Sequence, residues 1–175
     1  KKMDLNPENY IPLTSFSNHP YYTSYVFESP DSWSMEMINN LPLEKMFEVV
    51  KYSLQKGYTV AWAADVSDKG FRSDHGIAIV PNESWSEIEN EEKVFEEPVQ
   101  QKKITEEMRQ TDFDNYSTTD DHLMHIVGLA KDQLGTEYFI VKNSWGTGNP
   151  FGGFLYVSEA YFKFKTTSLL MNKKA

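Results

Sequence analysis

The chain has 175 residues, a formal net charge of −9 and no cysteine. This length suits one domain or a large part of one, and a chain without cysteine forms neither disulfides nor thiolate metal sites. The acidic balance argues against nucleic acid as a partner, because a phosphate-binding surface needs positive charge. No apolar run approaches the ~20 residues of a membrane span and no signal peptide is visible, which argues against a membrane partner.

Residues 1–40 form a lead-in rich in proline, asparagine, serine and aromatic residues. Neither the period of a helix nor that of a strand is sustained there, so we expect an irregular segment. The high aromatic content predicts that the segment is ordered, since disordered segments contain few aromatic residues.

Residues 41–65 are expected to form a helix followed by a strand. Pro42 suits the first helical position. Apolar residues then recur at the spacing of one helix face as far as the stop signal Gly57. The residues of this stripe are Leu43, Met46, Phe47, Val50 and Leu54. Residues 58–65 follow as a strand.

Residues 81–105 form an acidic segment, the least organised part of the chain. Between residues 83 and 97 there are seven glutamates and one lysine, a balance typical of a solvated face or loop. The segment lacks the pattern of Asp and Asn around a glycine that a calcium loop requires. Thr105 then has the position of an N-cap for a short helix.

A β-hairpin is predicted from two runs of β-branched and aromatic residues, 122–132 and 136–144. The turn between them contains Gly135, and glycine tolerates a positive φ. Such a hairpin brings His122 and Asn143 together on neighbouring strands. The amide oxygen of Asn143 then accepts the imidazole N–H that faces away from the reacting group, which fixes the ring and the tautomer of a general base.

The hairpin begins a β-rich core, residues 120–171, which continues with a glycine-rich loop at 146–153 and a strand at 154–157. Ser158 is expected to cap a short helix, and residues 166–171 to form the last strand. Several strands after one amphipathic helix predict an α+β fold, with an antiparallel sheet rolled into a barrel-like half.

Motifs in this core resemble the histidine and asparagine region of the papain-like cysteine peptidases. The motifs are Asp121-His122-Leu123-Met124, Lys142-Asn143-Ser144-Trp145-Gly146 and Gly153-Phe154-Leu155-Tyr156-Val157. The wider chain is most similar to the bleomycin hydrolase and aminopeptidase C branch, and the resemblance is weakest in the variable residues 81–105. Other segments that carry it are Asn9 to Phe16, His19 to Tyr22, Asn40 to Leu43, Gly57 to Ser67, Tyr161-Phe162 and Asn172 to Lys174.

The resemblance implies the β-rich half of a papain-like fold. In the family, the nucleophilic cysteine and the glutamine of the oxyanion hole lie N-terminal to the histidine, and residues 1–121 contain no such motif. We therefore expect residues 1–175 to be the C-terminal portion of a peptidase domain, inactive without a Cys-bearing segment or chain. The branch further implies an aminopeptidase acting on peptides without a cofactor or metal, a ring-shaped homo-oligomer and a cytoplasmic location.

The same resemblance assigns roles to four residues. His122 acts as general acid and base, and Asn143 orients its ring. Trp145 is expected to cover the hydrogen bond between them and to keep water away from it. Asp121 either tunes the imidazolium electrostatically or simply ends the preceding loop.

Two alanines of the predicted strand at 58–65 are further candidates. In papain-like enzymes a similar strand runs along the substrate cleft, where small residues leave room for a side chain. By resemblance Ala63 or Ala64 lines that wall, and plain packing in the core is the alternative.

Two other function classes stay open. One is a non-catalytic binding or assembly module that keeps the fold. The other is a metal-dependent hydrolase whose ligands are Asp121, His122 and His125, with Asp120 nearby. Residues three apart on a strand face opposite ways, so the two imidazoles are expected to diverge, which disfavours the metal site.

Overall fold

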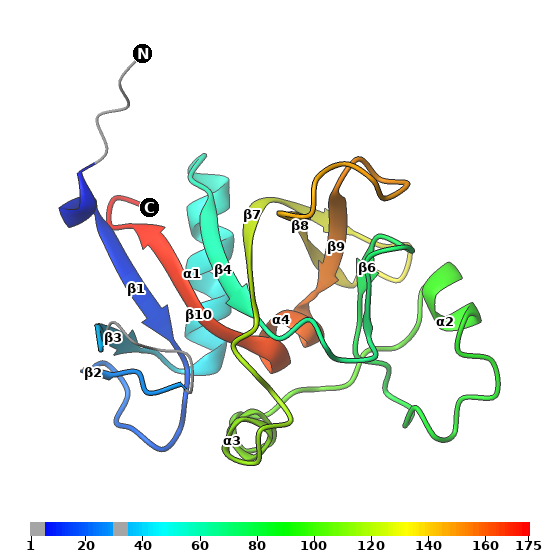
Figure 1. Cartoon of the computed structure of the whole chain (residues 1–175), viewed down its shortest axis with the longest axis horizontal. Coiled ribbons are helices and arrows are strands. Elements are labelled where there is room, and N and C mark those ends of the chain that lie inside the picture. Colours follow the sequence, from blue (N-terminus) through cyan, green and yellow to red (C-terminus); the bar gives the residue numbers. More distant parts are fainter. Residues whose placement is uncertain (1–5, 30–34) are drawn as a thin grey trace.

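The computed structural model describes residues 6–29 and 35–175. Its helices are η1 (Pro7–Asn9, a 3-10 helix), α1 (Leu43–Gln55), α2 (Lys93–Glu96), α3 (Glu106–Asp114) and α4 (Glu159–Lys165). Its strands are β1 (Tyr10–Thr14), β2 (Ser24–Val26), β3 (Met37–Asn40), β4 (Val60–Ala64), β5 (Phe71–Arg72), β6 (Ile77–Ala78), β7 (His122–Lys131), β8 (Glu137–Lys142), β9 (Phe154–Ser158) and β10 (Thr166–Asn172). Figure 1 shows the helices arranged around this strand-rich layer. None of the helices in the described part of the chain has the length and apolar character that crossing a membrane requires.

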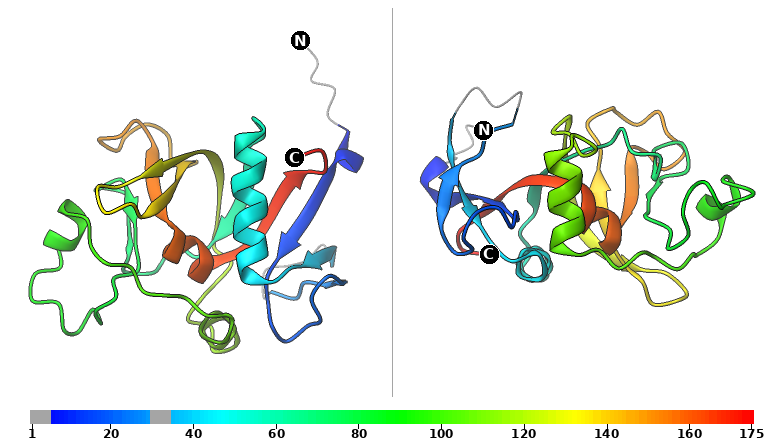
Figure 2. Two further views of the ribbon diagram at one scale, coloured as in Figure 1. Left: turned by 180° about the vertical axis from the view of Figure 1, so that it is seen from behind. Right: turned by 90° about the horizontal axis from the view of Figure 1, so that it is seen from below.

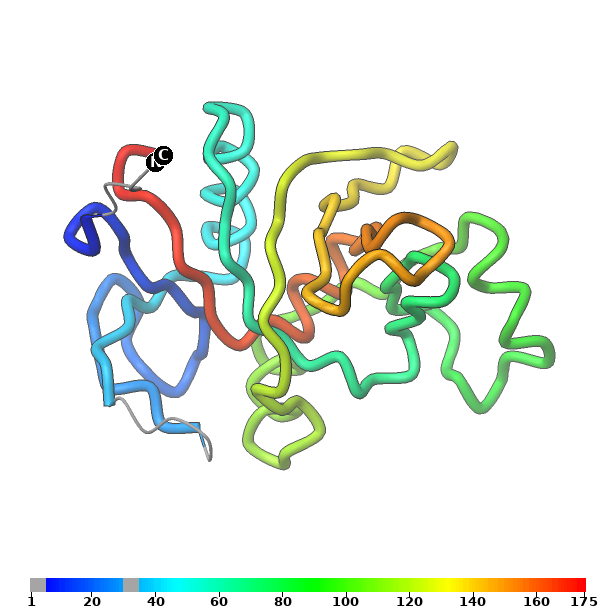
Figure 3. The backbone as a smooth tube through the Cα atoms, turned by 45° about the horizontal axis from the view of Figure 1, so that its top comes forward, coloured from blue at the N-terminus to red at the C-terminus, as the bar shows by residue number. Residues whose placement is uncertain are grey.

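The strands of the described residues form one sheet, in the order β2-β3-β1-β10-β4-β7-β8-β9-β6-β5. The pairs β1–β3 and β6–β9 are parallel, and the other pairs are antiparallel. β7 joins two parts of the sheet, because its first half pairs with β4 and its second half with β8, with a register shift between Ile126 and Gly128. Figure 3 shows the course of β7 turning between these two parts. The predicted α+β class is confirmed, with a mixed sheet rather than a wholly antiparallel one.

The irregular structure predicted for residues 1–40 is wrong for much of their described part, because β1, β2 and β3 lie there. β1 pairs with β10 at the far end of the chain, where Tyr10 lies opposite Asn172. This long-range pairing stabilises a strand that shows no alternation of its own. The expectations for residues 1–5 and 30–34 fall outside the described residues.

Helix α1 lies against one face of the sheet, as the view from behind in Figure 2 shows. The predicted apolar stripe faces inward. Its buried members are Leu43, Met46, Phe47 and Val50. Pro42 is the N-cap rather than the first helical residue. Because a proline offers no capping side chain, the Glu106 carboxylate of α3 accepts the hydrogen bond of the Leu43 N–H at 3.1 Å instead.

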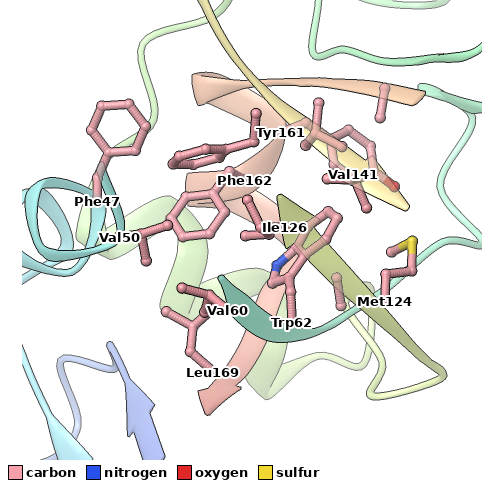
Figure 4. Packing of buried hydrophobic residues seen from close by; sticks show 14 of the residues in the cluster. Phe47, Val50, Val60, Trp62, Met124, Ile126, Val141, Tyr161, Phe162 and Leu169 are labelled. Atoms are coloured by element: carbon pink, nitrogen blue, oxygen red, sulfur yellow. The ribbon is translucent and has the colours of Figure 1, made fainter. Parts of the chain in front are cut away.

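The main hydrophobic core lies where α1 and α4 meet the sheet (Figure 4). Phe162 of α4 is a central side chain of this core. Its ring centroid lies 4.7 Å from that of Phe139, 5.9 Å from Phe47 and 6.1 Å from Trp62. Trp62 is fully buried and donates from Nε1 to Thr166 Oγ1 at 2.8 Å. These aromatic contacts therefore tie both helices to β4 and β8.

The acidic segment at residues 81–105 is packed more closely than a solvated loop. Most of its glutamates are exposed, but α2 places Phe95 in a second buried cluster with Ile79 and Tyr138. Trp85 stacks on Phe95 with the ring centroids 5.7 Å apart. Aromatic and aliphatic residues between the glutamates therefore anchor the segment to the end of the sheet.

Both predicted N-caps are present. Thr105 Oγ1 accepts a hydrogen bond from the Met108 N–H at 3.2 Å at the start of α3. Ser158 Oγ accepts one from the Tyr161 N–H at 3.1 Å at the start of α4. Each cap satisfies an N–H group that the first turn of a helix leaves unpaired.

Candidate active site

The β7–β8 hairpin places a histidine and an asparagine side by side, as the sequence predicts. His122 is the first residue of β7, and Asn143 directly follows β8. The turn is closed by Asp132 Oδ1, which accepts from the Thr136 N–H at 2.9 Å, and by Gly135 at a φ of +85°. The result is a distance of 2.8 Å between His122 Nε2 and Asn143 Oδ1.

This contact defines the tautomer of His122. An amide oxygen can only accept a hydrogen bond, so Nε2 carries the proton and Nδ1 is the basic nitrogen of the neutral ring. Asn143 is buried and His122 is half-buried, which leaves the ring accessible. Among the described residues, no hydrogen bond reaches Nδ1. The geometry therefore offers a base with a fixed orientation and a free lone pair.

Trp145 lies against the imidazole of His122. The two ring centroids are 4.6 Å apart at an interplanar angle of 38°. The edge of Phe71 supports the indole at a centroid distance of 6.1 Å. Trp145 shields this side of the ring, while 58% of its own surface is exposed. Its outer face is thus available to a bound molecule.

The loop that carries Trp145 is held by side chains that sequence reasoning missed. Lys142 Nζ donates to the carbonyl oxygens of Gly146 and Gly152, each at 3.2 Å. Asn149 Nδ2 donates to Ser73 O at 3.2 Å and so joins this loop to the one before β6. The lysine and the asparagine stand within or beside the predicted motif, but their hydrogen bonds follow from loop geometry that composition does not reveal.

Ser144 and Leu123 are further neighbours of His122 that were not singled out from the sequence. Ser144 Oγ lies 3.4 Å from His122 Nε2, on the same side as Asn143. Leu123 follows His122 on β7 and is 61% exposed. Because neighbouring residues of a strand face opposite ways, this exposed leucine lies on the other face of β7 from the imidazole.

The two candidate alanines lie on opposite faces of β4. Ala64 pairs with His122 in the sheet register, is fully buried and belongs to the main core. Ala63 pairs with Leu123 and therefore points to the other face. Both alanines are buried. Ala63, 8% exposed, stands next to the exposed leucine, whereas Ala64 belongs to the main core.

Asp121 has contacts that fit the end of a loop. Its Oδ1 accepts from the Val66 N–H at 3.0 Å, and its Oδ2 accepts from Thr119 Oγ1 at 3.0 Å. Burial and the nearby charge of Asp65 raise the pKa of the Asp121 carboxyl above its usual value. The carboxyl group thus closes the connection into β7, which favours the second of its two predicted roles.

The raised pKa predicts a pH-dependent effect of Asp121→Asn. Stability from a group whose pKa is raised on folding is present below the unfolded value, about 3.9, and is lost as the pH rises through the folded value. The neutral asparagine avoids that loss. We expect the variant to melt at a higher temperature than the parent at pH 7, with the difference shrinking toward pH 4. A melting-temperature difference that is constant between pH 4 and 7 would contradict this assignment.

His125 lies away from His122. Its Nε2 is 2.7 Å from Thr59 Oγ1, and its side chain is exposed on the other face of β7. Within residues 6–29 and 35–175, no three His, Cys, Asp or Glu side chains are grouped to hold a metal ion. The ligand set of the metal-dependent alternative is therefore not brought together.

Comparisons with known proteins identify the family and the fold. The peptidase C1-like family matches residues 1–175. The crystal structure of PepW from Lactobacillus rhamnosis HN001 has a TM-score of 0.66 and 19% identity, over 97% of this chain and 36% of that chain. The bromelain protease from Ananas comosus, in complex with the E64 inhibitor, has a TM-score of 0.41 and 17% identity, over 71% of this chain and 45% of that chain. No curated protein matches the chain.

The chain therefore spans 36% of the length of the PepW chain. That likeness concerns the fold, whereas the family match extends over every residue of the sequence. The hairpin that joins His122 to Asn143 lies inside the family match. This protein belongs to the peptidase C1-like family and has a papain-like protease fold.

Proposed function

We propose that this chain supplies the histidine and the asparagine of a cysteine-type peptidase, of the aminopeptidase type found in the bleomycin hydrolase branch. The observation that carries the proposal is the 2.8 Å contact between His122 Nε2 and Asn143 Oδ1 in a member of the peptidase C1-like family. The sequence contains no cysteine. The nucleophile thus comes from a Cys-bearing segment or chain, and residues 1–175 alone are expected to be inactive.

In the proposed reaction, the cysteine and His122 form a thiolate and an imidazolium. Such pairing lowers a thiol pKa from about 8.5 to roughly 3–4 in papain. The thiolate attacks the peptide carbonyl, and the imidazolium gives its Nδ1 proton to the leaving amine. Nδ1 then takes a proton from water, which hydrolyses the acyl-enzyme and releases the thiolate. Asn143 holds the ring throughout.

The sheet face that carries Leu123, which follows His122 in the chain, is proposed to receive a substrate side chain. Ala63 and the exposed Leu123 lie opposite each other in the β4–β7 pairing. The alanine leaves space and the leucine offers apolar contact. Trp145 flanks the other side of the imidazole. Ala64 is omitted from this surface because it is buried in the core.

Aminopeptidase specificity, peptide substrates and a ring-shaped homo-oligomer are proposed from the resemblance to the bleomycin hydrolase branch. The test uses the complete gene product that contains this chain. We expect hydrolysis of aminoacyl-naphthylamides that iodoacetamide abolishes. If the product instead cleaves N-terminally blocked peptides at internal bonds, the aminopeptidase part of the proposal is rejected. A folded product with serine, alanine or glycine at the nucleophile position, and no hydrolysis, would favour the non-catalytic module.

Asn143→Ala is expected to lower kcat of the complete enzyme by about 10- to 100-fold. A hydrogen bond to a charged group contributes roughly 1.5–3 kcal/mol, and each 1.4 kcal/mol corresponds to a factor of ten in rate. Asn143→Asp keeps an acceptor at the same position and is the matched control, for which we expect a smaller loss. The measurement is steady-state kcat at the pH optimum. Equal losses in both variants would argue against an orienting role.

A further inference from the structure

A buried lysine lies at the end of α4. Lys165 is the last residue of α4, and its side chain is 2% exposed. Its ammonium nitrogen lies 3.3 Å from Asp68 Oδ2, 3.3 Å from Asp112 Oδ2 and 3.9 Å from Asp65 Oδ2. An ammonium group is rarely buried unless carboxylates and hydrogen-bond acceptors surround it. Lys165 is therefore buried together with the carboxylates that pair with it.

Two loops reach this ammonium from different elements. Asp65 and Asp68 belong to the loop that follows β4, and Asp112 lies near the end of α3. Lys165 Nζ also donates to Ser117 O at 3.0 Å and to Thr118 Oγ1 at 3.2 Å, both in the turn after α3. Figures 1 and 3 show these segments converging where β4 ends and β7 begins.

The same two loops are joined to each other just before His122. Asp65 Oδ2 accepts from the Thr119 N–H at 3.4 Å, and Asp121 Oδ1 accepts from the Val66 N–H at 3.0 Å. The next contact along the sheet is the pairing of Ala64 with His122. Lys165 thus binds the loop that follows β4 and the turn that precedes β7, which flank the pairing of Ala64 with His122.

We propose that Lys165 is a positioning residue for His122. By binding the loop after β4 and the turn after α3 to one ammonium group, it fixes the start of β7 and hence the distance between His122 Nε2 and Asn143 Oδ1. This role rests on the proposed function, because that reaction requires a fixed imidazole. Small displacements of a reacting group reduce rates strongly.

A second buried lysine on the same helix provides a matched control. Lys163 is 7% exposed and forms ion pairs with Glu44 at 2.6 Å and with Glu159 at 2.5 Å. Its carboxylate partners lie on α1 and α4, away from the loops that lead to His122. Lys163 and Lys165 are therefore both buried, ion-paired lysines of α4. They differ in the segments of the chain that they bind.

The experiment compares Lys165→Met and Lys163→Met in the complete gene product. Both variants lose a buried ammonium group and are expected to melt lower, Lys165→Met by about 10 °C and Lys163→Met by less, because the Glu44 and Glu159 partners of Lys163 are more exposed. Only Lys165→Met is expected to lower kcat, by about 10- to 100-fold with KM within twofold. Only this variant is expected to lose the slowly exchanging NMR signal of the His122 Nε2 proton.

A third variant separates an effect on the position of His122 from an effect on the stability of the protein. Lys165→Met combined with Asp68→Asn and Asp112→Asn removes two carboxylates together with the ammonium, and it is expected to recover most of the melting temperature. If kcat and the His122 signal stay low in this variant, the positioning role is supported. If both return to parental values, Lys165 acts only through stability and the inference is overturned.

The NMR readout also separates this inference from the proposed function. If the parental protein has no peptidase activity but loses the His122 signal only in the Lys165 variants, the positioning contact stands and the peptidase proposal fails. If the parental protein is active and Lys165→Met changes neither kcat nor the His122 signal, the peptidase proposal stands and the positioning role fails.

Discussion

Replacing His122 with alanine in the complete enzyme is expected to lower kcat by at least about 10³-fold. The imidazole provides both proton transfers of the proposed reaction, and each is worth roughly 10²–10⁴ in rate. It also keeps the cysteine ionised, so the alanine variant should react slowly with iodoacetamide at pH 6. The ring is only half-buried, and its loss should leave the melting temperature nearly unchanged. Steady-state kinetics and alkylation rates check both statements.

His125→Ala is the matched control for this prediction. His125 stands on the same strand and bonds to Thr59 on the other face, so its removal should leave kcat within about twofold, as is usual for surface changes away from a site. If His122→Ala lowers kcat by less than tenfold, His122 is not the general acid and base. Equal loss in both variants, together with bound zinc, would revive the metal-dependent alternative.

The histidine and asparagine pair was predictable because a hairpin is local. Only 21 positions separate His122 from Asn143, and the turn with Gly135 specifies which residues of the two strands meet. The stripe of α1 and the caps at Thr105 and Ser158 are local signals of the same kind. Each of these signals depends on residues that are close to one another in the sequence.

The features missed from the sequence depend on distant partners. β1 is a strand because β10 lies beside it, more than 150 positions later, and Pro12 within it masks the usual pattern of a strand. Lys165 looks like a surface residue of a short helix until Asp65, Asp68 and Asp112 are brought around it. Sequence reasoning has no access to such contacts, since nothing in the local pattern marks them.

The distant contacts also decide where the largest stability effect lies. Phe162→Ala is expected to lower the free energy of unfolding by about 3–5 kcal/mol, the usual cost of emptying a buried aromatic site. Its ring contacts aromatic residues of α1, β4 and β8, so the cavity adjoins three elements that cannot all close on it. A loss of this size is a large share of the 5–15 kcal/mol that a typical domain has.

Phe164→Ala is the matched control, since Phe164 lies two residues further on α4 and is only half-buried. We expect a loss of about 1–2 kcal/mol there, because less apolar surface returns to water. Denaturant unfolding of the complete gene product measures both values. Similar losses for the two variants would mean that Phe162 is not the centre of the core. In that event α4 would be held in place mainly by the ion pairs that join Lys163 to α1 and Lys165 to α3.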